Sequence, residues 1–353
     1  MRKLATIQEI LEIKPIKGAD RIECARVQGW DVVVQKGQFK VREKCIYFEI
    51  DSILPIQSWC KFLEKKDSPG KPVRLKTQRM RGQLSQGLIV SLNILKDYVN
   101  ADIDEHPEID KYEDYEVGTD LTDILGITKY VPEVPACLQT DAKGARPSYI
   151  HKTDKDRIQA FPDLIQEFHG KLVYITQKID GTSSTFVNMV EEFDCCGRNW
   201  SFKYDAKNTY WKICDKYNLK EKLQRIYKET KRNYGVQGEC YGEKIQKNRL
   251  GIKGQDLKVF DVINLKGHKY LDFYELKEFC ERLELSMVPV LKICKFEWNS
   301  IEELLEEAKG NYESGQIQEG IVITPVHGFH SEVLNGRATF KVINNDFLLK
   351  GGD

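Results

Sequence analysis

The sequence lacks any apolar run long enough to cross a membrane, since its longest hydrophobic stretches have the length of a strand and contain charges. It also lacks the apolar segment near the N-terminus that a secretory signal peptide requires. The ten cysteines include no Cys-x-x-Cys pair and no histidine cluster accompanies them, which argues against structural zinc and favours reduced thiols. These absences predict an intracellular protein with no membrane partner.

Net charge is absent as well, because 54 Lys and Arg residues balance 54 Asp and Glu residues. The overall charge therefore provides no evidence for a polyanionic partner. The charges are nevertheless unevenly distributed, since residues 71–81 carry cations and no acid, whereas residues 101–123 are dominated by acids. A basic stripe can follow a phosphate backbone, but it is as readily a solvated loop.

The first hundred residues are typical of a small all-β domain. Short β-branched and aromatic runs, separated by glycine-containing or polar turns, occupy residues 21–27, 30–35, 44–50 and 87–91. Strands of this length suit a small closed barrel of the oligonucleotide/oligosaccharide-binding (OB) type, with an immunoglobulin-like sandwich as the alternative. Such a barrel binds single strands, tRNA or nothing at all, so the fold alone does not identify a function.

We predict three segments: an OB-type domain over residues 1–100, a linker or insertion rich in acids and prolines over 101–149, and a larger α+β domain over 150–353. In the last segment, apolar residues at helical spacing or cap signals predict helices at 204–231, 274–283 and 300–308, and a helix start at Thr153 or Asp154. Strands are expected at 172–187, 195–199, 235–239, 257–263, 317–324 and 338–343.

The tetrad Lys178-Ile179-Asp180-Gly181 lies between two strand-like runs. If both flanks are strands, their alternation directs Lys178 and Asp180 to one face, and Gly181, which has no Cβ, permits a close approach. A lysine is nucleophilic only after it loses a proton, and a nearby metal cation held by Asp180 is one way to lower its pKa. Taken alone, however, the tetrad more often marks a strand that ends in a turn.

Four further charged residues, Arg198, Glu239, Glu319 and Lys341, fall on strand-like segments or at their ends. A charge inside an apolar strand is costly to bury unless something pairs with it. Any one of the four could form a structural salt bridge or face outward, but the set is harder to explain in that way.

Read in order, five short motifs resemble the motif series of the covalent nucleotidyltransferases, which include ATP-dependent DNA and RNA ligases and mRNA capping enzymes. They are the tetrad at 178–181 and the segments 237–242, 259–262, 319–322 and 340–342. Residues 29–34, 47–51, 79–87, 152–159 and 238–246 look most like the nick-sealing RNA ligases that carry an OB domain in front of the catalytic domain. The resemblance implies an OB-type β-barrel followed by an ATP-grasp-like nucleotidyltransferase domain with antiparallel sheets and flanking helices.

The resemblance also implies an activity. Lys178 would attack the α-phosphate of ATP and become a lysyl-AMP, the AMP would move to a 5′-phosphate end, and a 3′-OH would then displace it to join the ends. The expected role is nick sealing in RNA repair by a monomer, with RNA or an RNA/DNA nicked duplex as partner, ATP as co-substrate and Mg2+ or Mn2+ as the metal.

The resemblance assigns site residues one by one. Three carboxylates, Asp180, Glu239 and Glu319, would hold a hydrated Mg2+ or Mn2+ and would be catalytic together with Lys178 and Lys341. Phe260 would stack on adenine, and Lys341 would contact the α-phosphate. Besides Lys178, Glu239, Phe260 and Lys341, the expected ATP-binding set contains Arg157, Gln159, Gln177 and Arg198, and the two arginines would reach ribose or phosphates.

Two positions depart from the pattern of the family. Many relatives have a glutamate directly before the nucleophile, where this chain has Gln177, and some have a second lysine where this chain has Ile343. Phosphate contact would then rest on Lys341 alone or be shared with Arg337 or Lys350.

Two alternatives remain open at this point. A DNA ligase or an mRNA capping guanylyltransferase would share the tetrad, but in those families an OB domain follows the catalytic domain, and only twelve residues follow Lys341. A non-enzymatic OB-type nucleic-acid-binding protein is a different class of answer. The presence of all the candidate charged residues together argues against it.

Overall fold

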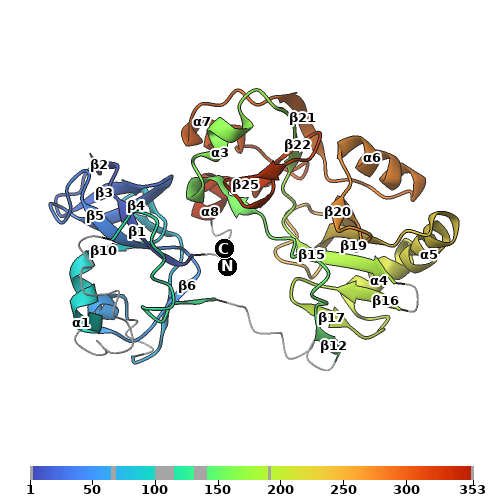
Figure 1. The fold of residues 1–353 in the computed structure, drawn as a ribbon, viewed down its shortest axis with the longest axis horizontal. Helices are drawn as coiled ribbons and strands as arrows, with labels where there is room; N and C mark the ends of the chain where they lie inside the picture. Colours follow the sequence, from blue (N-terminus) through green and yellow to red (C-terminus); the bar gives the residue numbers. More distant parts are fainter. Residues whose placement is uncertain (1–2, 65–68, 100–114, 131–140, 190–191, 351–353) are drawn as a thin grey trace. The chain divides into compact units, whose positions relative to one another are not determined.

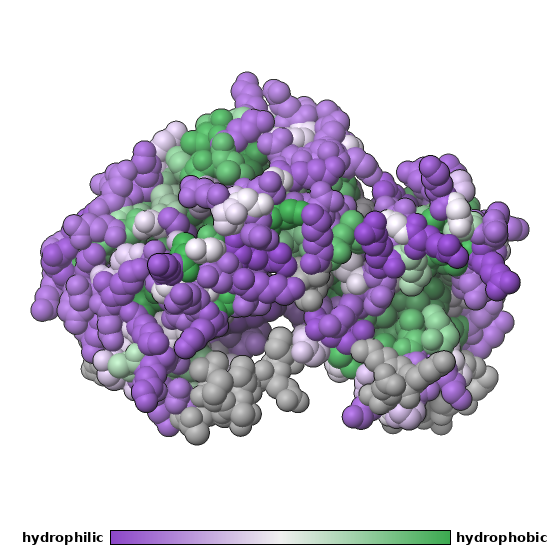
Figure 2. All heavy atoms as spheres, turned by 180° about the vertical axis from the view of Figure 1, so that it is seen from behind, coloured by the Kyte–Doolittle hydropathy of each residue, from purple (hydrophilic) through white to green (hydrophobic). Residues whose placement is uncertain are grey.

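The computed structural model describes residues 3–64, 69–99, 115–130, 141–189 and 192–350. The chain forms two compact units, Met1–Glu133 and Val134–Gly352 (Figure 1), and each unit is described below by itself. None of the helices in these ranges is long and apolar enough to cross a membrane. Figure 2 shows a surface covered mainly by hydrophilic residues, on which hydrophobic side chains gather in separate patches.

The first unit is built from short antiparallel strands. One sheet has the order β1-β5-β10, a second β2-β3-β4 and a third β11-β6-β7, and β8 pairs with β9. Their bounds are β1 (Ala5–Glu9), β2 (Glu12–Pro15), β3 (Ile22–Val27), β4 (Trp30–Gln35), β5 (Lys44–Phe48), β6 (Ser52–Leu54), β7 (Val73–Arg74), β8 (Gln78–Met80), β9 (Gln83–Ser85), β10 (Leu88–Val90) and β11 (Thr128–Lys129). The four strands predicted in this region are confirmed as β3, β4, β5 and β10. Three short helices, η1 (Ser58–Leu63), η2 (Leu92–Leu95) and α1 (Lys96–Val99), complete the unit.

Residues 115–130 belong to this first unit, although the sequence places them in a linker over 101–149. Leu121, Leu125 and Ile127 are buried in the same core as Ile46 and Phe48, and β11 pairs with β6. The many acids of the segment suggest a solvated linker, but burial of these three apolar side chains stabilises its packing against the first unit. The rest of the predicted linker before residue 115, and residues 131–140, lie outside the described ranges.

The second unit contains two sheets. The seven-stranded sheet consists, in spatial order, of β12 (Ala142–Ala145), β17 (Trp200–Phe202), β16 (Phe193–Cys196), β15 (Thr182–Asn188), β18 (Tyr234–Gly242), β19 (Gln255–Asn264) and β20 (Lys269–Tyr270). The five-stranded sheet consists of β13 (Asp156–Arg157), β25 (Phe340–Ile343), β22 (Gly320–Pro325), β14 (Leu172–Gln177) and β21 (Val290–Lys295). Within the described ranges their strand pairs are antiparallel except for β13 with β25, and β23 (His330–Ser331) and β24 (Gly336–Arg337) form a small hairpin.

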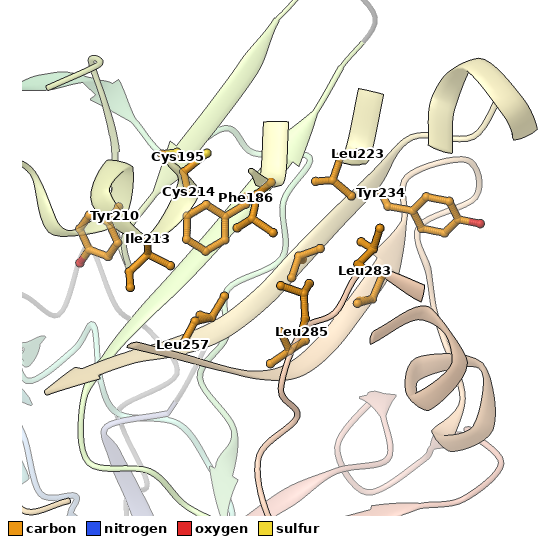
Figure 3. Packing of buried hydrophobic residues seen from close by; sticks show 14 of the residues in the cluster. Phe186, Cys195, Tyr210, Ile213, Cys214, Leu223, Tyr234, Leu257, Leu283 and Leu285 are labelled. Carbon is orange, nitrogen blue, oxygen red and sulfur yellow. The ribbon is translucent and has the colours of Figure 1, made fainter. Parts of the chain in front are cut away.

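Helices cover one face of each sheet. On the seven-stranded sheet, α4 (Thr209–Lys216), α5 (Leu219–Thr230) and α6 (Phe273–Arg282) bury an apolar cluster that includes Phe186 and Leu257 (Figure 3). On the five-stranded sheet, α3 (Leu164–Phe168) and α7 (Ile301–Glu307) cover a second cluster around Phe340. The short helices η4 (Ile158–Ala160) and α8 (Asn345–Leu349) complete this unit. The opposite face of each sheet carries the polar residues considered below.

The predicted helices agree with the structure except at two points. The helical pattern over 204–231 forms two helices, α4 and α5, because Asn218 adopts a left-handed conformation with φ 49° between them. The predicted helix start at Thr153 or Asp154 is wrong, since that segment leads into β13. Thr153 bonds the Ser183 hydroxyl and Asp154 pairs with Arg198, so tertiary partners take the place of a helix cap.

A buried group of three charges connects the two sheets of this unit. Asp261 on β19 accepts from the Lys155 ammonium at 2.6 Å and pairs with the Arg337 guanidinium at 2.7 Å. Burial by itself would raise the pKa of Asp261, but Arg337 and Lys155 outweigh it and the pKa is lowered. Arg337 also lies over the ring of Tyr270, 4.1 Å from its centroid. The carboxylate therefore neutralises two cations that would otherwise be desolvated without a partner.

We expect Asp261→Ala to lower the free energy of unfolding by about 3–5 kcal/mol, because it leaves Lys155 and Arg337 as buried, uncompensated charges. Urea unfolding followed by circular dichroism measures the change. The matched control is Glu284→Ala, which removes an exposed partner of Lys222 and should cost less than about 1 kcal/mol. A loss for Asp261→Ala no larger than that of the control would contradict the assignment.

Candidate active site

The tetrad that contains Lys178 forms the turn between the two sheets of the second unit. β14 ends at Gln177 and β15 begins at Thr182, so strand alternation does not govern the side chains of the turn. A Cβ at Gly181 would lie 2.4 Å from the carbonyl oxygen of Cys240, which confirms that this position permits a close approach. The neighbour that approaches is the backbone of β18.

Lys178 forms an ion pair with Glu319, and 2.7 Å separates Nζ from Oε2. Burial lowers the pKa of Lys178, but the charges of Glu319 and Glu239 outweigh burial and the pKa is raised. Glu319 directly precedes β22, and Gly320, with φ 148°, follows it. Any Cβ at Gly320 would lie 2.1 Å from the carbonyl oxygen of Val342, so glycine is required there. The amine is thus held as an ammonium until a cation or a ligand displaces Glu319.

Three carboxylates converge on this turn. Glu239 lies on β18, on the face opposite the helices, and its neighbour Cys240 is buried against them. Burial, offset partly by Lys178, raises the pKa of Glu239 to about 8, and the charges of Glu319 and Asp180 contribute to the increase. Burial and then Glu319 also raise the pKa of Asp180. The three acids repel one another and are desolvated, an arrangement that a cation would relieve.

The described part of the chain contains no group of three or more His, Cys, Asp or Glu side chains arranged to hold a metal ion directly. Glu319 nevertheless lies close enough to contribute to the raised pKa values of Asp180 and Glu239, and Asp180 also contributes to that of Glu239. Oxygen donors that interact at this longer range suit a hard cation that keeps water ligands, as Mg2+ commonly does. This donor set fits the hydrated metal that the family resemblance implies.

Cations gather on the five-stranded sheet near the same point. β13 pairs in parallel with β25, which sets Arg157 beside Lys341. Phe340 and Val342 are buried under the helices, so the alternation of β25 directs Lys341 to the opposite face. Burial, followed by repulsion from Lys178 and Arg157, lowers the pKa of Lys341 to about 7. In the ranges that the structure describes, no carboxylate forms a salt bridge with Lys341, and an anionic ligand would stabilise its charge.

Phe260 lies on the uncovered face of β19, because its neighbours Val259 and Leu257 point into the helix-covered core. It packs against the apolar cluster that contains Ile179 and Tyr312. Its ring is therefore next to the turn that carries Lys178, where a planar group could stack on it.

The remaining candidate residues differ in how they are held. Gln159 is buried, and its Oε1 has no hydrogen-bond partner among the described residues. Gln177 donates to Oε1 of Gln318 at 2.7 Å, which occupies its amide within the protein. Arg198, in the turn between β16 and β17, pairs with Asp154 at 2.8 Å, and both side chains are partly exposed.

The two other cations considered for phosphate contact are arranged differently. Arg337 is held by Asp261, and Lys350 is exposed just after α8. Ile343 is buried beside Phe347, so the position where relatives place a second lysine belongs to the core in this chain.

Sequence reasoning missed two residues of the site. Nε of Arg249 lies 3.1 Å from Asp180, and its guanidinium lies over the ring of Phe347 at 4.6 Å. Tyr312 reaches the backbone of the Lys178 turn. Arg249 follows closely on the quoted segment 238–246, which could have drawn attention to it, whereas nothing in the sequence marks Tyr312.

Comparison with known proteins places this geometry in context. The model of an OB-fold domain matches residues 4–92, and the model of the RNA ligase family matches residues 171–343. Several solved structures of Naegleria gruberi RNA ligase are similar over the whole chain. A variant with AMP and Mn has a TM-score of 0.84 and 32% sequence identity to this chain, and the match covers 99% of both chains. The enzyme with PPi has a TM-score of 0.83 and 34% identity, and the match covers 100% of both chains. A second variant, with ATP and Mn, has a TM-score of 0.82 and 33% identity, and the match covers 99% of both chains. A search of the curated proteins found no match.

We expect Lys341→Met to stabilise the free protein. The folded-state pKa of Lys341, about 7, lies below its usual value of 10.5. Between these two pH values the lysine is protonated in the unfolded chain but not in the folded protein. The destabilisation caused by burying its charge is therefore complete below pH 7 and decreases toward pH 10.5. At pH 6.5 the variant should exceed wild type by at least about 1 kcal/mol, with a smaller difference at pH 9.5.

Denaturant unfolding at both pH values provides the measurement, and Lys350→Met is the control, since Lys350 is exposed. A Lys341→Met protein that is less stable than wild type at pH 6.5 would show that an anionic partner within the protein already compensates the lysine.

Proposed function

The chain belongs to the RNA ligase family, and we propose that this ATP-dependent RNA ligase joins 3′-OH and 5′-phosphate ends through a lysyl-AMP and a polynucleotide-adenylate. The observation that carries the proposal is the convergence of Lys178, two further cations and three carboxylates on the turn between the two sheets. That set contains a nucleophile, groups to neutralise phosphate oxygens and donors for a divalent metal.

In the first step Nζ of Lys178 forms a bond to the α-phosphorus of ATP, the bond from that phosphorus to the pyrophosphate oxygen breaks, and the nitrogen loses a proton. The ion pair with Glu319 at 2.7 Å must open for this attack. Lys341 and Arg157, side by side on β25 and β13, would neutralise oxygens of the α-phosphate. Lys341 is suited to this because an anion restores the favourable environment that burial and its cationic neighbours remove.

ATP is the co-substrate and Mg2+ or Mn2+ the metal. Naegleria gruberi RNA ligase has been solved with ATP and Mn, and the oxygen donors of Asp180, Glu239 and Glu319 fit such a cation through water. When bound, the metal supplies charge neutralisation at the phosphate oxygens. Glu319 would then have a second cation to face, which would allow it to release Lys178.

The adenosine moiety would lie against the apolar cluster beside the Lys178 turn. Phe260 would stack on adenine, and the buried Oε1 of Gln159 can accept a hydrogen bond from a donor such as the adenine amino group. Arg198 would reach ribose or phosphate by exchanging its contact with Asp154. Glu239 could also meet the ribose, while Gln177, held by Gln318, would border the site.

The later steps require a polynucleotide, for which we propose nicked RNA or an RNA/DNA duplex bound by a monomer. In the first unit, Arg79 and Arg81 belong to the hairpin of β8 and β9 and are exposed. Arg74 instead pairs with Asp51 at 2.5 Å. The hairpin is thus one part of the basic stripe that is available to contact phosphates.

We expect the protein to become covalently labelled with AMP when it is incubated with α-labelled ATP and Mn2+. Lys178→Ala should abolish the label, and Lys178→Arg should fail as well, because a guanidinium stays protonated and cannot attack. Lys309→Ala, which changes an exposed lysine, is the control. Persistent labelling of Lys178→Ala would refute the assignment of the nucleophile.

We expect Asp180→Ala, Glu239→Ala and Glu319→Ala each to reduce the rate of adenylation by roughly a hundredfold or more, because each removes a carboxylate that the metal needs. The folds should persist, and Glu306→Ala, an exposed carboxylate, should leave the rate unchanged. Thermal melts of the same proteins separate this expectation from a purely structural salt bridge. A variant that melts much earlier but adenylates normally would remove its residue from the site.

A further inference from the structure

Tyr312 lies outside every motif considered above, in the connection between α7 and β22, yet it is 3% exposed. Its ring packs in the cluster with Ile179, Tyr241 and Val288. The loop that carries it is closed on itself, since the Tyr312 N–H donates to the Gln316 carbonyl at 2.8 Å. The packing of the ring and the hydrogen bond within the loop therefore both fix the position of Tyr312.

The hydroxyl of Tyr312 contacts the main chain of three residues of the proposed site. It donates to the Lys178 carbonyl at 2.7 Å, and it accepts from the Asp180 N–H and from the Glu319 N–H, each at 3.1 Å. A tyrosine hydroxyl has one proton and two lone pairs. All of its hydrogen-bonding capacity is thus used to join the Lys178 turn to the residue that precedes β22.

This connection differs in kind from the ion pair of Lys178 and Glu319. The ion pair must open before Nζ can attack, whereas a restraint on the backbone remains when the side chains separate. The Lys178 N–H also donates to the Gly320 carbonyl at 2.9 Å, but that bond does not reach Asp180.

We propose that Tyr312 is a positioning residue of the ligase, and that its hydroxyl fixes the backbone of Lys178, Asp180 and Glu319 so that the amine and the metal-binding carboxylates address the same phosphate. The inference rests on the proposed function. The hydroxyl acts through the main chain, because its hydrogen bonds are used within the protein. An error of about 1 Å in the placement of reacting groups can cost on the order of a hundredfold in rate.

The test is Tyr312→Phe, which keeps the ring in its cluster and removes only the oxygen. The rate of lysine adenylation at saturating ATP should fall by roughly 10- to 100-fold, while KM for ATP should change by less than about threefold, since Phe260, Arg157 and Lys341 are not touched by the hydroxyl. The matched control is Tyr234→Phe, the same change at a buried tyrosine of the helix-covered core of the seven-stranded sheet, outside the proposed site. It should adenylate like wild type.

Rates are measured well below the melting temperature of each variant, and urea unfolding is recorded in parallel. Wild-type adenylation by Tyr312→Phe would overturn the inference, even if the variant were less stable. A rise in KM with an unchanged rate would overturn it too, because it would indicate a role in binding ATP. Failure of the wild-type protein to label itself with AMP would instead defeat the proposed function, and the inference with it.

Discussion

The ion pair between Lys178 and Glu319 is the interaction on which the site depends. Each charge is largely removed from water, which is tolerable only while the other is near. The pair joins the turn that follows β14 to the residue that precedes β22, and the raised pKa of Lys178, the proposed nucleophile, favours its protonated form. Chemistry therefore requires groups that replace each partner, and the surrounding acids and cations are placed where a metal and a phosphate could do so.

The fold distributes these groups between its two sheets. The seven-stranded sheet presents Glu239 and Phe260 on the face that the helices leave uncovered, and the five-stranded sheet presents Lys341 beside Arg157. Strand alternation explains why each of these residues has a buried apolar neighbour in the sequence. The tetrad itself is a turn, so its geometry comes from contacts with other segments. The helix-covered cores fix those segments, and the polar face can be specialised for ligands.

Local patterns in the sequence predicted most of the longer strands and helices but few of the short ones. The family resemblance supplied most of the residues that the structure brings together around Lys178. Contacts between distant segments were not predictable. Tyr312 contacts the Lys178 turn although 134 positions separate it from Lys178 in the sequence. No periodicity or motif in the sequence predicts such a contact. Thr153 and Asp154 carry a genuine helix-cap signal, but Ser183 and Arg198 engage their side chains instead.

The inclusion of residues 115–130 in the first unit has a consequence for any attempt to obtain that unit in isolation. A fragment that ended at residue 100 would lose Leu121, Leu125 and Ile127, and their apolar partners such as Ile46 and Phe48 would lose cover. It would also leave β6 without its neighbour β11, with unpaired backbone groups on an edge that invites association with other chains. Such a fragment would be prone to aggregation, whereas one extended through residue 130 would retain a closed core.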